Sequence, residues 1–103
     1  MEQVSAETAQ RYLADVDPLW RAFWFHMHLM AKNLREFSHG LGEIGDDVFS
    51  YHVSGQKNDL ARWVREVIGD ATLAAALDEV HSKEEALAAA KARVAELEAA
   101  AAA

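Results

Sequence analysis

The sequence contains 103 residues, of which 51% are hydrophobic and 26% charged, and its formal net charge at pH 7 is −7. This length and composition are typical of one folded domain and argue against disorder. The acidic excess argues against nucleic acid or an anionic membrane surface as a partner, because both bind through Lys and Arg. There is no cysteine, which excludes disulfides, thiolate nucleophiles and cysteine-based zinc sites.

The composition also predicts helices, because alanine is frequent while the chain contains one proline and five glycines. Acidic side chains interrupt every apolar stretch in the N-terminal part, which is therefore not typical of a signal peptide. The most apolar stretch, residues 19–31, is too short to span a bilayer. We therefore expect a cytoplasmic protein without a membrane span.

The first predicted helix begins after Ser5, a residue type favoured at helix N-caps, and carries apolar residues at spacings of three and four. Asp17-Pro18 predicts a second helix start, because proline is well suited to the first helical position. Residues 18–31 then fit two conformations, a helix with an aromatic stripe or a short strand with alternating faces. The periodicity does not decide between them.

Helix starts recur along the rest of the chain, each a capping side chain followed by an apolar face. The predicted caps are Asn33 (with Glu36 as a capping box), Asp46 or Asp47, Asn58, Asp70 and Ser82. Gly40, Gly42 and Gly45 are expected to loosen and then end the helix that begins after Asn33, and Gly69 to end another. Residues 54–57 are predicted to form a loop.

These patterns predict an all-α fold, a compact bundle of five or six short helices, with residues 23–30 as the candidate for a short extended segment. We expect a helical domain over residues 1–81 and a C-terminal amphipathic, alanine-rich helix over residues 82–103. This last helix either packs on the domain or binds another copy. The predicted core residues are Tyr12, Leu13, Phe23, Leu34, Phe37, Phe49, Val53, Leu60, Trp63, Val64, Val67, Leu73 and Leu77.

Four motifs in order between residues 23 and 70 resemble the small prokaryotic family known as domain of unknown function 5752. The family pattern is F-x-F-H, N-L-x-E-L, D-x-x-F-x-x-H-V and N-D-F-A-x-W-I-x-D-V-F-G-D. The matching residues are Phe23, Phe25, His26, Asn33, Leu34, Glu36, Asp46, Phe49, His52, Val53, Asn58, Asp59, Ala61, Trp63, Val67, Gly69 and Asp70. The resemblance covers residues 23–77, about half of the chain, and residues 58–70 are its most specific part.

The family has no established activity, so the resemblance implies fold boundaries and no catalytic residue. One departure concerns the short turn that usually follows the first histidine of the pattern. Here Met27-His28-Leu29-Met30 replaces that turn, which favours a continuous helix through this segment.

Histidines paired with carboxylates are the candidates for a metal site. Glu36-x-x-His39 places a carboxylate and an imidazole one helical turn apart, the spacing found in carboxylate-bridged di-iron bundles. His26-x-His28 would share one face of a strand but would point apart on a helix. The alternative interpretation of these residues is a solvated or packed surface. We expect no cofactor, with a divalent metal at Glu36 and His39 as the alternative.

His52 lies on the apolar side of a predicted helix, beside Phe49 and Val53. We expect a buried neutral imidazole bonded to a carbonyl or to a capping side chain, with a ligand or proton-transfer role as the alternative. Asp59 could orient this histidine, or simply favour the helix N-terminus through the macrodipole. The serines lack the context of an activated nucleophile, so we expect no enzyme.

The predicted function is therefore a non-catalytic module that binds itself or another protein. The aromatic segment is large for so small a domain, and the C-terminal helix has apolar residues at heptad-like spacing. The predicted interaction residues are Trp20, Phe23, Trp24 and Phe25 in the segment and Leu87, Val94 and Leu97 in the helix. The alternative is a metal- or cofactor-binding helical bundle that uses Glu36, His39 and other histidines.

Overall fold

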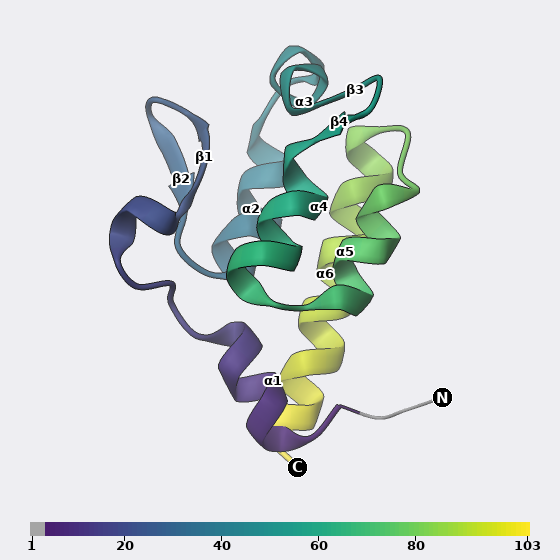
Figure 1. Ribbon diagram of the computed structural model, residues 1–103. Coiled ribbons are helices and arrows are strands. Elements are labelled where there is room, and N and C mark those ends of the chain that lie inside the picture. Colours follow the sequence, from purple (N-terminus) through teal and green to yellow (C-terminus); the bar gives the residue numbers. More distant parts are fainter. Residues whose placement is uncertain (1–3) are drawn as a thin grey trace.

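Residues 4–103, which the computed structural model describes, fold into six α-helices and two small β-hairpins (Figure 1). The helices are α1 (Ala6–Leu13), α2 (Leu34–Glu43), α3 (Asp46–His52), α4 (Asp59–Trp63), α5 (Ala71–Asp78) and α6 (Lys83–Ala101). One hairpin pairs β1 (Phe23–His26) with β2 (Leu29–Ala31), and the other pairs β3 (Val53–Ser54) with β4 (Lys57–Asn58). A 3₁₀ turn, η1 (Leu19–Arg21), precedes β1, and a π-helical turn, η2 (Val64–Ile68), continues α4. The predicted helical bundle is confirmed, and the candidate extended segment at residues 23–30 lies in the first hairpin, but the two hairpins mean that the fold is not purely α.

Residues 23–31 form a strand, a turn and a second strand, so the continuous helix favoured for this segment is wrong. The antiparallel strands pair Phe23 with Ala31, and the chain turns at Met27 and His28. Successive side chains of β1 alternate between a buried and an exposed face. This period of two is that of a half-buried strand, and it buries both Phe23 and Phe25, which a helix would direct to different sides.

The helix that was expected to begin at Pro18 is reduced to the single turn η1, with Pro18 before it. The backbone from Asp15 to Asp17 instead runs beside the end of β2, where the Val16 amide donates to the Lys32 carbonyl at 2.7 Å. This bond ties the segment after α1 to the β1–β2 hairpin.

Most predicted helix caps are confirmed by a side-chain oxygen that accepts the amide three residues later. These caps are Ser5 (3.1 Å), Asn33 (2.8 Å), Asn58 (3.0 Å), Asp70 (3.2 Å) and Ser82 (3.1 Å). The cap predicted at Asp46 or Asp47 is wrong, because Gly45 occupies the N-cap and both aspartates lie in the first turn of α3. The loop predicted at residues 54–57 is a tight turn between β3 and β4, in which Gly55 has φ of +58°.

The core lies between the β1–β2 hairpin and the helices, and it contains the residues expected from the periodicity. Leu13, Phe23, Leu34, Phe37, Phe49, Leu60, Trp63, Val64, Leu73 and Leu77 are buried, and Tyr12, Val53 and Val67 pack against them half-buried. Aromatic rings form its centre, since the Phe37 ring stacks on Trp63 at 5.2 Å and meets the edge of Phe23 at 5.5 Å.

The last helix, α6, packs against α1, α2 and α5 along its length (Figure 1). Its buried face is formed by Ala86, Ala90, Arg93 and Leu97. Arg93 makes two hydrogen bonds, of 2.8 and 3.0 Å, to the fully buried carboxylate of Asp70. The helix is therefore part of the common core and does not project away from it.

Candidate functional site

The β1–β2 hairpin is attached to the helices through its inner face. The Phe25 ring stacks on Phe37 at 5.9 Å and lies directly over Gly40 of α2, where an added Cβ would clash with it. Gly40 was expected to loosen α2, yet the helix continues to Glu43. The glycine instead allows the ring to approach the helix backbone closely.

His52 forms a second attachment, between the hairpin and the start of α4. Its ring is buried, with Nε2 at 2.8 Å from the Phe25 carbonyl oxygen and Nδ1 at 2.8 Å from Oδ2 of Asp59. The predicted hydrogen bond to a carbonyl is confirmed, and Asp59 does orient the ring. Both ring nitrogens lie at hydrogen-bond distance from an oxygen atom, so the ring is fixed between the hairpin and the start of α4.

The charge of Asp59 is stabilised where it meets His52. Burial by itself would raise the pKa of Asp59, but hydrogen bonds from His52 and Lys57 outweigh it and the pKa lies below its usual value. Lys57 Nζ is 3.2 Å from Oδ2 of Asp59 and also donates to the Tyr51 carbonyl. The cluster therefore links the hairpin, α3 and α4 through the contacts of His52 and Lys57 with Asp59 and with the backbone, which is a structural arrangement.

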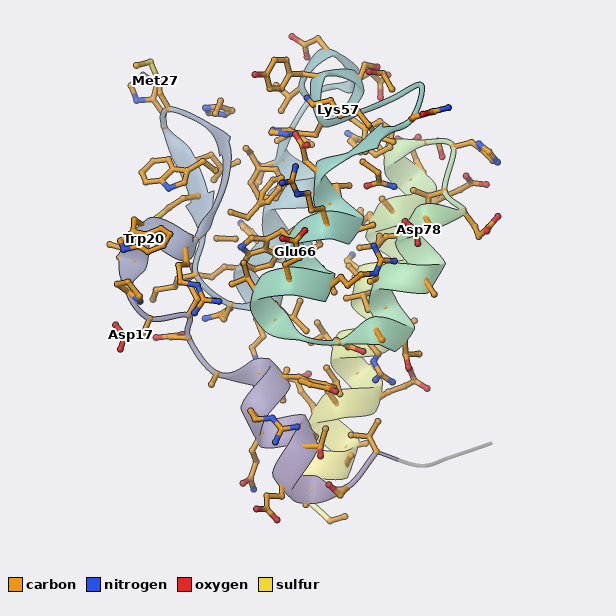
Figure 2. All side chains as sticks on the ribbon, viewed as in Figure 1. Asp17, Trp20, Met27, Lys57, Glu66 and Asp78 are labelled. Atoms are coloured by element: carbon orange, nitrogen blue, oxygen red, sulfur yellow. The ribbon has the colours of Figure 1, made fainter. Side chains whose placement is uncertain are left out.

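The outer surface of η1, the hairpin and α3 carries large apolar side chains that residues 4–103 leave exposed. We call these side chains the aromatic face. They are Leu19 (53% exposed), Trp20 (78%), Trp24 (49%), Met27 (79%) and Tyr51 (70%). Figure 2 shows Trp20 and Met27 pointing away from the helices, Met27 at the tip of the hairpin. Soluble domains rarely leave several such side chains exposed in one region, except at an interaction site.

A groove of about 480 Å³ lies between the hairpin and α3, and we call it the hairpin groove. Its lining comprises Trp24, Phe25, His26 and Met27 from the hairpin and Asp47, Val48, Tyr51 and His52 from α3. A smaller hollow of about 290 Å³ lies beside Trp24 and is also lined by Trp63 and Val67. Trp24 thus stands at both hollows.

The structure divides the predicted interaction residues between surface and core. Trp20 and Trp24 are exposed, whereas Phe23, Phe25 and Leu97 are buried and contribute no free surface. Leu87 and Val94 pack half-buried against the core, so the heptad-like seam is occupied within the chain. The available surface is therefore the aromatic segment without its phenylalanines.

The predicted metal pair is engaged in separate surface contacts. Glu36 binds Lys32 at 2.6 Å, and His39 Nε2 lies 3.2 Å from Glu43, one turn along α2. Among residues 4–103, no group of three or more His, Asp or Glu side chains is arranged to hold a metal ion.

The histidine pair at the hairpin tip is also separated by the turn. The rings of His26 and His28 lie 6.4 Å apart, and Nδ1 of His26 accepts the backbone amide of His28 at 3.2 Å. They therefore do not share the strand face on which a metal pair was considered.

Sequence reasoning missed Met27, Tyr51 and Asp47 as members of the candidate site. Met27 was read as part of a helix, and Tyr51 stood at a polar position of α3 between its apolar residues. Strict alternation of side chains from Phe23 to His26 is the pattern of a strand. It would have predicted that Trp24 lies on the solvent face and that Met27 lies at the following turn. Nothing local joins α3 to the hairpin, because the groove between them forms only in the folded chain.

Within residues 4–103, no helix has the length and apolar character needed to cross a membrane. Comparison of the sequence with protein-family models, with curated proteins and with solved structures gives no match in any of the three.

Proposed function

We propose that this chain is a non-catalytic protein-interaction module that binds itself or another protein through the aromatic face. The observation that carries the proposal is that Trp20, Trp24, Met27 and Tyr51 are exposed on neighbouring elements, although the same domain has a packed apolar core. Trp, Tyr and Met are enriched in protein interfaces, where they supply large contact areas. The proposed partner surface is apolar at its centre with a polar rim.

The contacts of His52 support a role without catalysis. Both ring nitrogens are used to hold Phe25 and Asp59, so the imidazole offers no free atom to a substrate. A general base must reach the proton that it removes. The absence of enzymatic activity and the cytoplasmic location remain predictions.

We further propose that the chain belongs to the family of domain of unknown function 5752. The residues that carry the resemblance have structural roles that support a shared fold. Asn33, Asn58 and Asp70 cap helices, and Gly69 has φ of +90° at the end of η2. A shared scaffold of this kind leaves the side chains on its surface free to differ, Trp24 and Tyr51 among them.

The proposal is tested by replacing Trp20, Trp24 and Met27 together with serine. A matched control carries serine at Glu79, Glu84 and Lys91, which are exposed away from the aromatic face. Light scattering over a range of concentrations measures self-association, and cross-linking in the producing cells followed by mass spectrometry detects other partners. We expect the association seen for the wild-type chain and the control to be lost in the aromatic-face variant.

A different result would contradict the proposed function. A wild-type chain that remains monomeric and forms no cross-links from the aromatic face would show that the exposed side chains have no partner. Circular dichroism of each variant checks that the helices are intact.

A further inference from the structure

We propose that the hairpin groove binds a cationic side chain, Lys or Arg, from a partner segment whose neighbouring residues are apolar. The cation would lie against Trp24 and Tyr51 and next to the carboxylate of Asp47. This inference rests on the proposed interaction function and names the chemistry of the partner at the same surface.

The walls of the groove suit the stem and the head of a long basic side chain. Trp24 and Tyr51 supply aromatic surface, on which methylene groups pack and toward which a cation is attracted by the ring quadrupole. The chain already contains one such contact, since Lys57 Nζ lies 4.1 Å from the centre of the Tyr51 ring. Lys57 therefore already occupies the Tyr51 ring, and Trp24 is the exposed aromatic wall of the groove that carries no such contact within residues 4–103.

The charge of the groove favours a cation over a neutral or acidic group. The described residues that line it include no Lys or Arg, and within residues 4–103 the Asp47 carboxylate forms no ion pair. The His52 ring is already engaged by Asp59, with Nδ1 at 2.8 Å from Oδ2. Asp47 is therefore a carboxylate without an ion-pair partner at the edge of an apolar groove. A cation placed there would contact both this carboxylate and the aromatic wall.

Net charge separates this partner from a second copy of the chain. Each copy carries −7, so two copies repel each other, whereas a basic partner is attracted to the whole molecule. The proposed occupant of the groove is therefore a basic and apolar segment of another protein.

The test uses the purified full chain and three blocked, fluorescently labelled hexapeptides in which leucine alternates with lysine, glutamine or glutamate. Fluorescence anisotropy measures the Kd of each peptide. We expect the Leu–Lys peptide to bind about fivefold more tightly than the Leu–Gln peptide, as expected for a cation on an aromatic ring at an exposed site. The Leu–Glu peptide should bind least.

Two pairs of variants locate the binding. Trp24→Ala is expected to weaken binding of the Leu–Lys peptide about fivefold. Thr72→Ala, at an exposed neutral residue of α5 outside the groove and the aromatic face, should leave the Kd unchanged. Asp47→Asn should weaken it about threefold, while Asp46→Asn removes the same charge one residue away without effect. If circular dichroism shows that Trp24→Ala is unfolded, Tyr51→Ala replaces it as the variant that alters the aromatic lining of the groove.

Three results would overturn the inference, and they differ in what remains. Equal binding of the Leu–Lys and Leu–Gln peptides, lost with Trp24→Ala, would leave the aromatic face as a binding surface without a cation. Equal weakening by Asp46→Asn and Asp47→Asn would show general attraction to an acidic chain. Binding of no peptide, with self-association that Trp24→Ala abolishes, would make a second copy the occupant and retain the proposed function.

Discussion

Two regions of this chain break the usual division between a polar surface and an apolar interior, in opposite senses. Among α5 and α6 a charged pair is inside, since Asp70 is fully buried and Arg93 is 7% exposed. On η1, the β1–β2 hairpin and α3, large apolar side chains such as Trp20 and Met27 are outside. The comparison shows that residue type alone does not place a side chain.

The two regions differ in whether contacts within the chain compensate for the unusual position of the side chain. The Asp70 carboxylate accepts hydrogen bonds from Arg93 and from the Leu73 amide, so its burial is compensated within the fold. Nothing in residues 4–103 covers Trp20 or Met27 to a comparable degree. A buried charge whose hydrogen bonds are all made within the fold indicates a role in stability. Large apolar side chains left uncovered indicate a surface that binds a partner.

The largest expected effect on stability comes from breaking the buried pair of Asp70 and Arg93. Arg93→Ala leaves the Asp70 carboxylate buried without its partner, and we expect the free energy of unfolding to fall by about 3–5 kcal/mol. The hydrogen bonds to Asp70 also raise the pKa of Arg93 above its usual value, so the guanidinium keeps its charge. Urea unfolding followed by circular dichroism measures the change.

Lys91→Ala serves as the control, because it shortens an exposed basic residue on the same helix. Its effect should stay within about 0.5 kcal/mol. A loss of under about 1 kcal/mol for Arg93→Ala would mean that water reaches Asp70. The pair could then no longer be contrasted with the aromatic face as a buried charge compensated within the fold.

The next effect concerns the contact that holds the hairpin to the helices. Gly40→Ala places a methyl group against the Phe25 ring, and we expect a loss of about 1–3 kcal/mol in the free energy of unfolding. Gly42→Ala on the same helix meets only Leu87 at 3.8 Å, an ordinary contact, and should stabilise the protein by about 0.5 kcal/mol through helix propensity. Thermal unfolding of both variants measures the difference in sign.

Equal effects of the two alanines would show that the Phe25 ring moves aside at little cost. The hairpin would then be a loosely held element, and its exposed outer face would need no partner to explain it. Opposite signs would instead confirm that the inner face of the hairpin is as closely packed as the helical core.

The same contacts explain which parts of the structure could be predicted from sequence. Caps such as Asn58 and Ser82 were predictable because a capping side chain and its amide lie three residues apart. The core was predictable because its apolar spacing persists over whole helices. For residues 18–31, by contrast, helix and strand patterns fitted equally, and the choice was made by contacts with Gly40 and His52, which lie elsewhere in the chain.

The candidate site shows the same limit. Trp20 and Trp24 were found because they belong to one dense aromatic segment. Phe25 was named as an interaction residue with them although it is buried, and so was Phe23, which the core prediction also contained. Tyr51 joins Trp24 only across the hairpin groove. The role of Asp70 as a cap was visible, whereas its pairing with Arg93, 23 residues away, required the packing of α6.

The smallest expected effect is the pH dependence of the attachment between His52 and Asp59. The pKa of Asp59 is lowered in the folded protein, so its charge stabilises the fold above its unfolded-state pKa and this contribution is lost as pH falls through the folded pKa. We expect Asp59→Asn to lower the free energy of unfolding by about 1 kcal/mol at neutral pH. The difference from the wild-type chain should shrink toward about pH 3, as measured by urea unfolding across that range.

Glu36→Gln is the matched control, because hydrogen bonds from Lys32 lower the pKa of Glu36 in the same direction at a more exposed position. Salt at about 1 M should suppress the Glu36 effect by screening and leave most of the Asp59 effect, because the partner of Asp59 is buried. If salt removes both effects alike, His52 and Asp59 meet in water. The hairpin would then be held to the helices by the packing of Phe23 and Phe25, without a buried polar attachment.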